Sequence, residues 1–175
     1  MFLLFGLGNF GSKYQAHRHN AGYWLVESLL KKLNLPPLTL QKKLKTRLSK
    51  DKNLILATNE TFMNESGPSL QSTAHFYKIK PANIYLAHDD LDLKVGESKI
   101  QFDRGPAGHH GVESVIQVLG TQSFHRIRLG IGRHPKITPE KYVLTPPNFF
   151  EKLRINKNIS QTSADIISKL KLSGL

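Results

Sequence analysis

The chain has 175 residues, a length that suits one domain with an ordinary hydrophobic core. Its 39% hydrophobic and 22% charged residues argue against a disordered or fibrous chain, and no stretch approaches the roughly 18 apolar residues of a membrane-spanning helix. Lysine and arginine number 25 against 13 aspartate and glutamate, and this net charge of +12 suits a polyanion such as nucleic acid, although solvated lysines on an ordinary basic surface would give the same balance.

Strand and helix patterns alternate in the first third of the chain. Residues 2–5 are apolar and run directly into a glycine, which predicts a buried strand and not a signal peptide. Asn20 is expected to cap a helix whose apolar residues recur at helical spacing as far as Leu33. Residues 44–49 and 53–58 predict a hairpin.

The rest of the chain continues this alternation. Ser66 is expected to cap a second helix, and Gly120 to end a third. Further strands are predicted at 84–88, 98–102 and 126–131, and an amphipathic last helix with its inward face at Ala164, Ile167 and Leu170. Interleaved strands and helices with one hairpin favour a single three-layer α/β/α domain over 1–175, with a mixed, mostly parallel central sheet.

The first motif is Gly6-Leu-Gly-Asn-Phe-Gly11, the glycine spacing of a dinucleotide-binding turn. In such a site the third glycine opens the helix that holds the pyrophosphate. Here helical periodicity starts only after Asn20, and lysines stand where the ribose-binding acid belongs. The context therefore disfavours a nucleotide site, and the alternative is a turn that lets the backbone pass close to another part of the molecule.

Histidines and carboxylates occur at two predicted element ends. His17 and His19 precede the first helix, and His88-Asp89 ends a predicted strand. Imidazole suits general base catalysis near neutral pH, and a carboxylate beside it can fix its tautomer. Ordinary loop histidines remain an alternative. Zinc is another, with His109 as a further ligand, but no known zinc-ligand spacing is present.

Two polar stretches lead into the later helices. Residues 62–67 carry an asparagine amide that can both donate to a carbonyl and accept from an amine, and residues 105–111 combine small residues with two histidines, as ligand-contacting loops do. A capping turn and a flexible surface loop are the alternatives. Cysteine is absent, which excludes a thiol nucleophile and weakly favours the cytoplasm, and no Gly-x-Ser-x-Gly turn occurs. A hydrolase of this sequence would use water as the nucleophile.

Read together, these stretches resemble the bacterial peptidyl-tRNA hydrolases. They occur in the family's order across residues 1–144, and the ordered set is far more specific than any one piece. The matching pieces are Gly6–Gly11 with Tyr14, Arg18-His-Asn20, Thr61-Phe-Met-Asn64 with Ser66-Gly67, His88-Asp-Asp-Leu-Asp-Leu93, Gly108-His109 with Gly111, and Phe124–Gly132.

The resemblance implies a reaction, hydrolysis of the ester between a peptide and the 3′-terminal ribose of tRNA. By position His19 is the general base and Asp89 orients it. The partner is peptidyl-tRNA, and no cofactor, metal, membrane or obligate protein partner is implied. The remaining implied roles are peptide binding by Asn9 and Asn64, a cleft lined by Tyr14 and Met63, a loop with His109 and His110 over it, and a tRNA 5′-phosphate grip by Arg128.

The sequence departs from the family pattern at two positions. His110 stands where the family has an asparagine that helps hold the catalytic water, so we expect His110 to lie beside that water and to titrate together with His19. Gln101 stands at the second basic position of the phosphate grip, where Lys99 or Arg104 could substitute. The rival functions are an RNA-binding relative without activity and a metal-dependent amidase.

Overall fold

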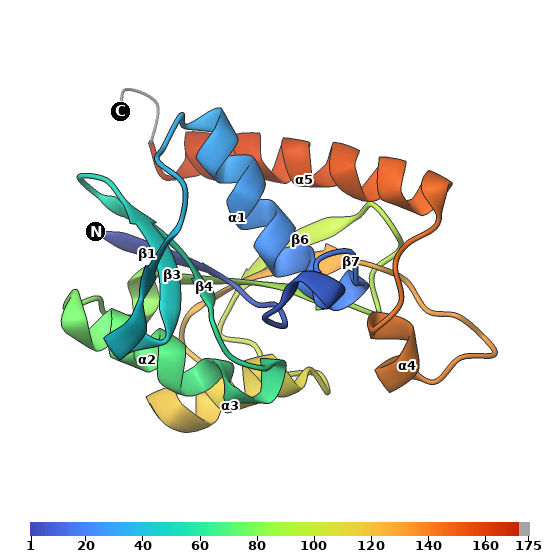
Figure 1. Cartoon of the computed structure of the whole chain (residues 1–175), viewed down its shortest axis with the longest axis horizontal. Coiled ribbons are helices and arrows are strands. Elements are labelled where there is room, and N and C mark those ends of the chain that lie inside the picture. The colour runs from blue at the N-terminus through green and yellow to red at the C-terminus, as the bar shows by residue number, and fades with distance from the viewer. Residues whose placement is uncertain (172–175) are drawn as a thin grey trace.

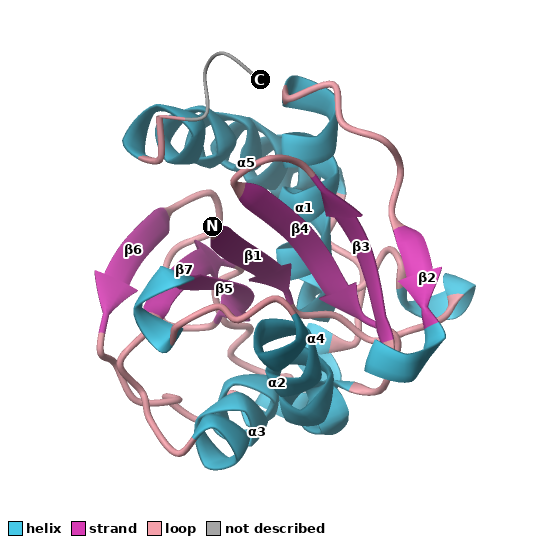
Figure 2. Cartoon of the chain, turned by 90° about the vertical axis from the view of Figure 1, so that its left-hand side faces the viewer, coloured by secondary structure: helices cyan, strands magenta, loops and turns pink. Residues whose placement is uncertain are grey.

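A twisted sheet crosses the middle of the molecule, with helices on both of its faces (Figure 2). The computed structural model describes residues 1–171. Within that range seven strands form one sheet in the order β2-β3-β4-β1-β5-β7-β6. The strands are β1 (Phe2–Gly6), β2 (Thr39–Gln41), β3 (Thr46–Lys50), β4 (Leu54–Asn59), β5 (Ile84–Asp90), β6 (Ser98–Phe102) and β7 (His125–Gly130).

The mixed sheet expected from the sequence is confirmed. Its four central strands, β4, β1, β5 and β7, are mutually parallel, whereas β2, β3 and β6 pair antiparallel at the two edges. The expectation of a mostly parallel sheet therefore holds for the centre and not for the edges. The hairpin lies where it was predicted, and the predicted strand 98–102 matches β6.

Two helices cover each face of the sheet (Figures 1 and 2). The four long helices are α1 (Ala21–Lys32) and α5 (Phe149–Lys169) on one face and α2 (Ser66–Phe76) and α3 (His110–Leu119) on the other. Strand β1 shows why both faces are dry. Leu4 packs with α1 and α5, whereas Leu3 and Phe5, which point the opposite way, pack with α2 and α3.

Several local predictions were wrong. The last helix starts earlier than expected because Asn148 and Glu151 form a capping box, and its buried face holds Ile155, Ile159 and Ile166 while Ala164 is exposed. Ser66 is the first residue of α2 and not its cap. Strand β2 and a short helix, α4 (Pro139–Val143), were not predicted.

The glycine-rich stretch serves close packing, as the alternative interpretation proposed. A Cβ placed on Gly6 would collide with the carbonyl of Gly22 in α1, and a Cβ on Gly22 would collide with the backbone of Ala87 and Leu7. Helix α1 therefore crosses β1 and β5 at backbone contact distance. This crossing brings the segment before α1 against the carboxyl ends of the central strands, where sites of α/β sheets form.

Among the described residues, the structure contains no helix with the length and hydropathy needed to cross a membrane.

Candidate active site

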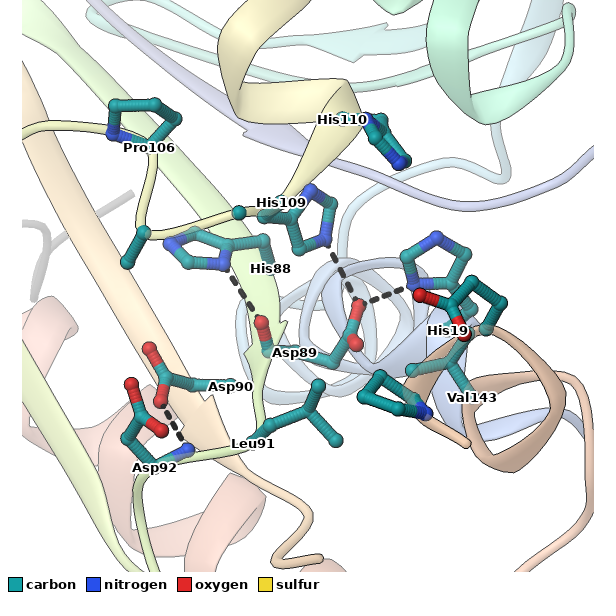
Figure 3. Close-up of a pocket in the computed structure, with 14 residues that line it drawn as sticks. His19, His88, Asp89, Asp90, Leu91, Asp92, Pro106, His109, His110 and Val143 are labelled. Carbon is teal, nitrogen blue, oxygen red and sulfur yellow. Dashed lines mark hydrogen bonds and ion pairs between the residues drawn. The ribbon is translucent and has the colours of Figure 1, made fainter. Parts of the chain in front are cut away.

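A cavity of about 90 Å³ opens at the carboxyl end of β5 (Figure 3). Its walls come from three segments and from α4. Its polar lining comes from the segment before α1, the end of β5 and the start of α3, and α4 contributes Glu140 between the apolar Pro139 and Val143. These lining residues include His19, Asp89, Asp90, His109, His110, Pro139 and Val143.

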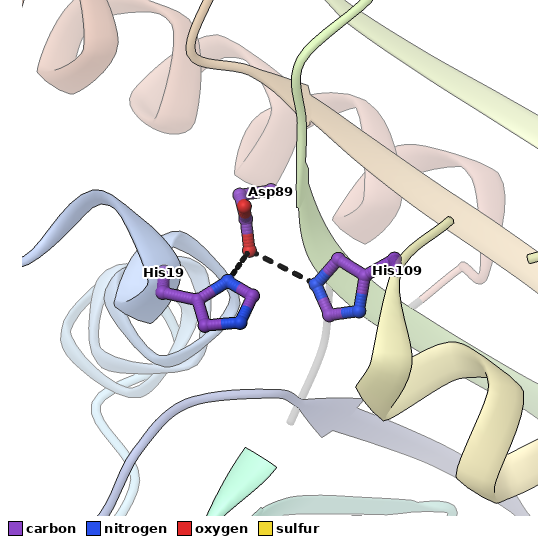
Figure 4. A group of neighbouring side chains, drawn as sticks. All are labelled: His19, Asp89 and His109. Carbon is purple, nitrogen blue, oxygen red and sulfur yellow. Dashed lines mark hydrogen bonds and ion pairs between the residues drawn. The ribbon is translucent and has the colours of Figure 1, made fainter. Parts of the chain in front are cut away.

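Two histidines share one carboxylate oxygen in this cavity (Figure 4). Oδ1 of Asp89 lies 2.8 Å from Nδ1 of His19 and 3.0 Å from Nε2 of His109. Asp89 is 3% exposed, and burial alone would raise its pKa. The charges and hydrogen bonds of His19 and His109 outweigh burial and hold the pKa of Asp89 well below its ordinary value, so the carboxylate is ionised.

The start of α3 fixes the proton of His109. Its Nδ1 accepts the backbone N–H groups of Gly111 and Val112, at 3.2 and 3.3 Å, as the cap of the helix. The ring proton therefore sits on Nε2, which donates to Asp89. In this state His109 is a donor to the carboxylate and has no nitrogen left to act as a base.

His19 has the opposite arrangement. An ionised carboxylate only accepts, so Nδ1 of His19 carries the proton and Nε2 has the free lone pair of a general base. Burial lowers the pKa of His19, but the charge and hydrogen bond of Asp89 outweigh it and raise the pKa above 6.5. His19 can therefore take a proton from water and remain stabilised as an imidazolium.

The adjacent residues of β5 are also paired. The Nδ1–H of His88 donates to the carbonyl of Asp89, and burial together with the repulsion that a charged His88 would meet from a charged His109 lowers the pKa of His88 to about 3. Oδ2 of Asp90 accepts from Nε of Arg128 at 2.7 Å, and both side chains are buried. His88 is thus a neutral spacer, and the charge of Arg128 is balanced inside the protein.

The three predicted tRNA contacts differ in exposure. Arg128 is 5% exposed, and its Nη1 donates to Oε1 of Gln101 at 2.7 Å. The residue at the second position of the expected phosphate grip is therefore a hydrogen-bond acceptor for Arg128 and adds no positive charge. Lys99 pairs directly opposite Arg128 across β6 and β7 and is exposed. Arg104 is half-buried, and its carbonyl accepts from the buried Arg126. Of the three, Lys99 offers the freest charge.

The predicted peptide-binding residues come from two loops. Oδ1 of Asn9 accepts the backbone N–H of Met63 at 2.9 Å, which leaves its Nδ2 free to donate. Met63 is buried and Asn64, its neighbour, is exposed. Tyr14 packs edge-on against Phe62, so an aromatic wall stands beside these amides.

The structure places His110 at the start of α3, where it lines the cavity with its side chain turned largely toward solvent. Its side chain is 72% exposed at the start of α3, and Nδ1 lies 3.5 Å from a carboxylate oxygen of Glu113 one turn later. It lines the mouth of the cavity, while the interior place beside Asp89 belongs to His109 (Figure 3). The sequence contained a sign of this pairing, the i, i+3 spacing of the two residues.

Three polar residues that hold the site together had no predicted role there. Arg18 is buried and bonded to the loop before α5. Asn20 begins α1, but its side chain bonds the backbone of Asn9 instead of capping the helix. Asn59, at the end of β4, bonds the backbone of Gly8. The motif Arg18-His-Asn20 pointed to the first two, whereas nothing in the pattern around Asn59 did.

His19, Asp89 and His109 also form a cluster that could hold a metal ion, with ligand atoms all within 4.8 Å of one another. The donor set fits a metal poorly. Coordination through Nε2 of His109 would move its proton to Nδ1, which already accepts two backbone N–H groups. The cap of α3 therefore favours a hydrogen-bonded triad over a metal site.

Comparisons with known proteins identify the family of the chain. A family model described as peptidyl-tRNA hydrolase matches residues 3–174. The chain is 41% identical over 170 residues to the peptidyl-tRNA hydrolase of Legionella pneumophila (strain Paris), covering 94% of this chain and 89% of that one. It is 40% identical over 156 residues to that of Coxiella burnetii (strain RSA 493 / Nine Mile phase I), covering 87% and 82%.

Solved structures are similar as well. A peptidyl-tRNA hydrolase in complex with N-propanol matches with a TM-score of 0.88 and 32% identity, covering 94% of this chain and 85% of that chain. The peptidyl-tRNA hydrolase of Acinetobacter baumannii matches with a TM-score of 0.86 and 33% identity over the same shares.

Proposed function

Because the chain belongs to the peptidyl-tRNA hydrolase family, we propose that it cleaves the ester between peptide and tRNA by water attack, with His19 as general base and Asp89 as the residue that orients it. The family is a hydrolase family that acts on peptidyl-tRNA. The observation that carries the mechanism is the 2.8 Å bond between Nδ1 of His19 and Asp89, since it leaves Nε2 as the basic nitrogen.

The proposed reaction needs one proton carrier. Nε2 of His19 removes a proton from water while the water oxygen attacks the ester carbonyl carbon, and the carbonyl oxygen becomes an oxyanion. Asp89 stabilises the imidazolium that forms. When the tetrahedral intermediate collapses, the bond to the ribose oxygen breaks and that oxygen takes the proton back from His19. The products are free tRNA and a peptide with a carboxyl end.

The peptide would be held by amides. Because Oδ1 of Asn9 already accepts the backbone N–H of Met63, the Nδ2–H of Asn9 is the group that would donate to a peptide carbonyl. Asn64 lies exposed on the next loop, where its amide would meet the peptide backbone, and Tyr14 and Met63 would form the wall. His109 would contribute mainly by holding Asp89, and His110 at the mouth would contact only the outer part of the substrate.

The tRNA would be held by charge. The net charge of +12 suits the phosphate backbone. Since Asp90 balances Arg128, we assign the larger share of phosphate binding to the exposed Lys99, which lies opposite the buried Arg128, and a smaller share to the half-buried Arg104.

Incubation with an N-blocked aminoacyl-tRNA tests the proposal. Release of free tRNA after exhaustive chelation, and its loss in His19→Ala, are the expected results. Binding of the tRNA without release would instead favour the RNA-binding relative without activity, and release that stops on chelation would favour a metal-dependent enzyme.

A further inference from the structure

Two asparagine side chains clamp consecutive residues of the loop after β1. Asn59 accepts the N–H of Gly8 through Oδ1 at 3.3 Å and donates through Nδ2 to the carbonyl of Gly8 at 2.7 Å. Asn20 bonds Asn9 in the same two-sided way, at 2.9 and 3.1 Å. In each case one side-chain amide hydrogen-bonds both the N–H and the C=O of the clamped residue, as the backbone of a neighbouring strand would.

We propose that Asn59 is a positioning residue for substrate binding, which acts by setting the place and direction of the Asn9 amide; this rests on the function proposed above. Asn59 also donates to the carbonyl of Thr61 at 2.8 Å, on the segment that leads to Met63. Because the Met63 N–H binds Asn9, these bonds close a ring from Asn59 through Gly8 and Asn9 to Met63 and back. The amide of Asn59 therefore fixes both the loop after β1, which carries Asn9, and the segment before Met63, to which Asn9 is bonded.

The sheet itself cannot do this. The pairing of β1 with β4 ends at Gly6 and Thr58, so the main-chain ladder stops before the loop begins. Asn59, which is 5% exposed, continues the pairing with its side chain. If its amide were lost, the Gly8 carbonyl would be unpaired beside the loop, and the loop would shift to find another partner.

Aspartate is the sharpest substitution because it keeps the shape of Asn59 while it replaces the NH₂ donor with a carboxylate oxygen and adds one negative charge. Its carboxylate can still accept from the N–H of Gly8 but would face the carbonyls of Gly8 and Thr61, to which Asn59 now donates. Asn156→Asp, on the exposed face of α5, introduces the same charge away from the loop and is the matched control.

The experiment is a double-mutant cycle. Asn59→Asp is expected to lower kcat/KM for an N-blocked aminoacyl-tRNA by about 10- to 100-fold, the loss that a misplacement of the order of 1 Å produces, while the Kd for deacylated tRNA and the activity of Asn156→Asp stay at the wild-type level. In the Asn9→Ala background the same Asn59→Asp change is expected to cost little more, because the residue on which it acts is gone.

A purely structural role would give a different pattern. Wild-type kcat/KM in Asn59→Asp, or losses that add fully to those of Asn9→Ala, would overturn the proposal. If Asn59→Asp does not fold, Asn59→Ser, which keeps a hydroxyl donor, takes its place in the cycle with the same expected non-additivity and a smaller loss.

A measurement without substrate separates this proposal from the proposed function. In ¹⁵N-labelled free protein, the side-chain NH₂ signals of Asn9 are expected to shift in Asn59→Asp and to stay in place in Asn156→Asp. Unshifted Asn9 signals would refute the positioning role whether or not the protein is active. If the Asn9 signals shift in Asn59→Asp but the wild-type protein releases no tRNA, the proposed function is refuted and the positioning of Asn9 by Asn59 stands.

Discussion

The guanidinium of Arg18 lies 2.6 Å from the carboxylate of Glu151, a residue 133 positions later in the chain. Arg18 also donates to the carbonyls of Thr145 and Pro146 and lies over the ring of Tyr142 at 4.2 Å. The same Glu151 oxygen accepts the N–H of Asn148 in the capping box of α5. The residue directly before the proposed base is thus tied to the segment that joins α4, the wall of the cavity, to α5.

This pair makes Arg18 a stability determinant. Arg18 is buried and Glu151 is 22% exposed, and Arg18→Ala removes the donor to this carboxylate and to the carbonyls of Thr145 and Pro146, so we expect it to lower the free energy of unfolding by about 1.5–3 kcal/mol. Arg133→Ala is the control, since its pair with Asp92 is exposed on both sides and is expected to contribute less than about 1 kcal/mol. Urea denaturation of both variants measures the difference, and equal losses would contradict a special role for the Arg18–Glu151 pair.

His19 is expected to control turnover and not tRNA binding. A positioned general base contributes about 10²–10⁴-fold, so His19→Ala should reduce kcat by that factor and leave the Kd for deacylated tRNA unchanged. His75→Ala, an exposed histidine on α2, is the control and should keep wild-type kcat. A His19→Ala variant that keeps the wild-type rate would exclude His19 as the base.

Asp89 should determine the acid side of the rate–pH profile. Burial lowers the pKa of His19, and the charge and hydrogen bond of Asp89 raise it above 6.5. In Asp89→Asn burial remains and the carboxylate is gone, so the pKa of His19 falls and the acid limb of kcat/KM moves to lower pH, with a lower plateau because the imidazole is less well oriented. An acid limb that moves to higher pH in the variant would contradict this assignment.

Asp90→Asn provides the comparison for this experiment. Asp90 is bonded to Arg128, and the structure shows no bond from it to His19. We therefore expect the acid limb to stay in place in Asp90→Asn. If Asp90→Asn shifted the limb and Asp89→Asn did not, the orienting carboxylate would be Asp90.

Lys99 and Arg128 should differ in their effect on salt dependence. Lys99 is exposed, so Lys99→Ala should reduce the slope of log affinity for tRNA against log salt by about 0.7–0.9, the share of one phosphate. Arg128→Ala should change the slope less and instead destabilise the fold by about 3–5 kcal/mol, because it leaves Asp90 buried without its partner. A larger slope change in Arg128→Ala would show that Arg128 leaves Asp90 to meet the phosphate.

His110 separates what the sequence predicts from what the structure implies. A histidine beside the catalytic water would titrate together with His19, and the acid limb would then lie at higher pH in the wild type than in His110→Asn. In the structure the ring of His110 is exposed to solvent and lies beside the carboxylate of Glu113. We therefore expect the two rate–pH profiles to coincide, and a displaced acid limb in the wild type would restore the interpretation from sequence.

Much of the fold could be predicted because its elements carry their own periodic signals. The apolar run of β1, the hairpin of β3 and β4, and the end of α3 at Gly120, whose φ is +66°, each follow from a few neighbouring residues. Strand β2 and helix α4 escaped prediction because they have only three and five residues, too few to show a period.

The candidate site was predictable in part. The motifs that contain His19 and Asp89 indicate their chemistry, and in the structure Nδ1 of His19 lies 2.8 Å from Oδ1 of Asp89. The sequence could not predict that His109 bonds the same oxygen, because this contact depends on where the N-terminal cap of α3 lies relative to β5. The sequence also placed His110 inside the site, where the structure has it exposed.

The sequence by itself determined which elements form and which side chains carry the chemistry, because periodic burial and residue type are local properties of the chain. Only the tertiary structure decided the partners. Arg128 meets Asp90, and Asn59 meets Gly8, because the strand order sets β5 beside β7 and β1 beside β4. A buried polar group must pair with whatever the fold places within about 3 Å of it, and that neighbour is set by strand order and not by distance along the chain.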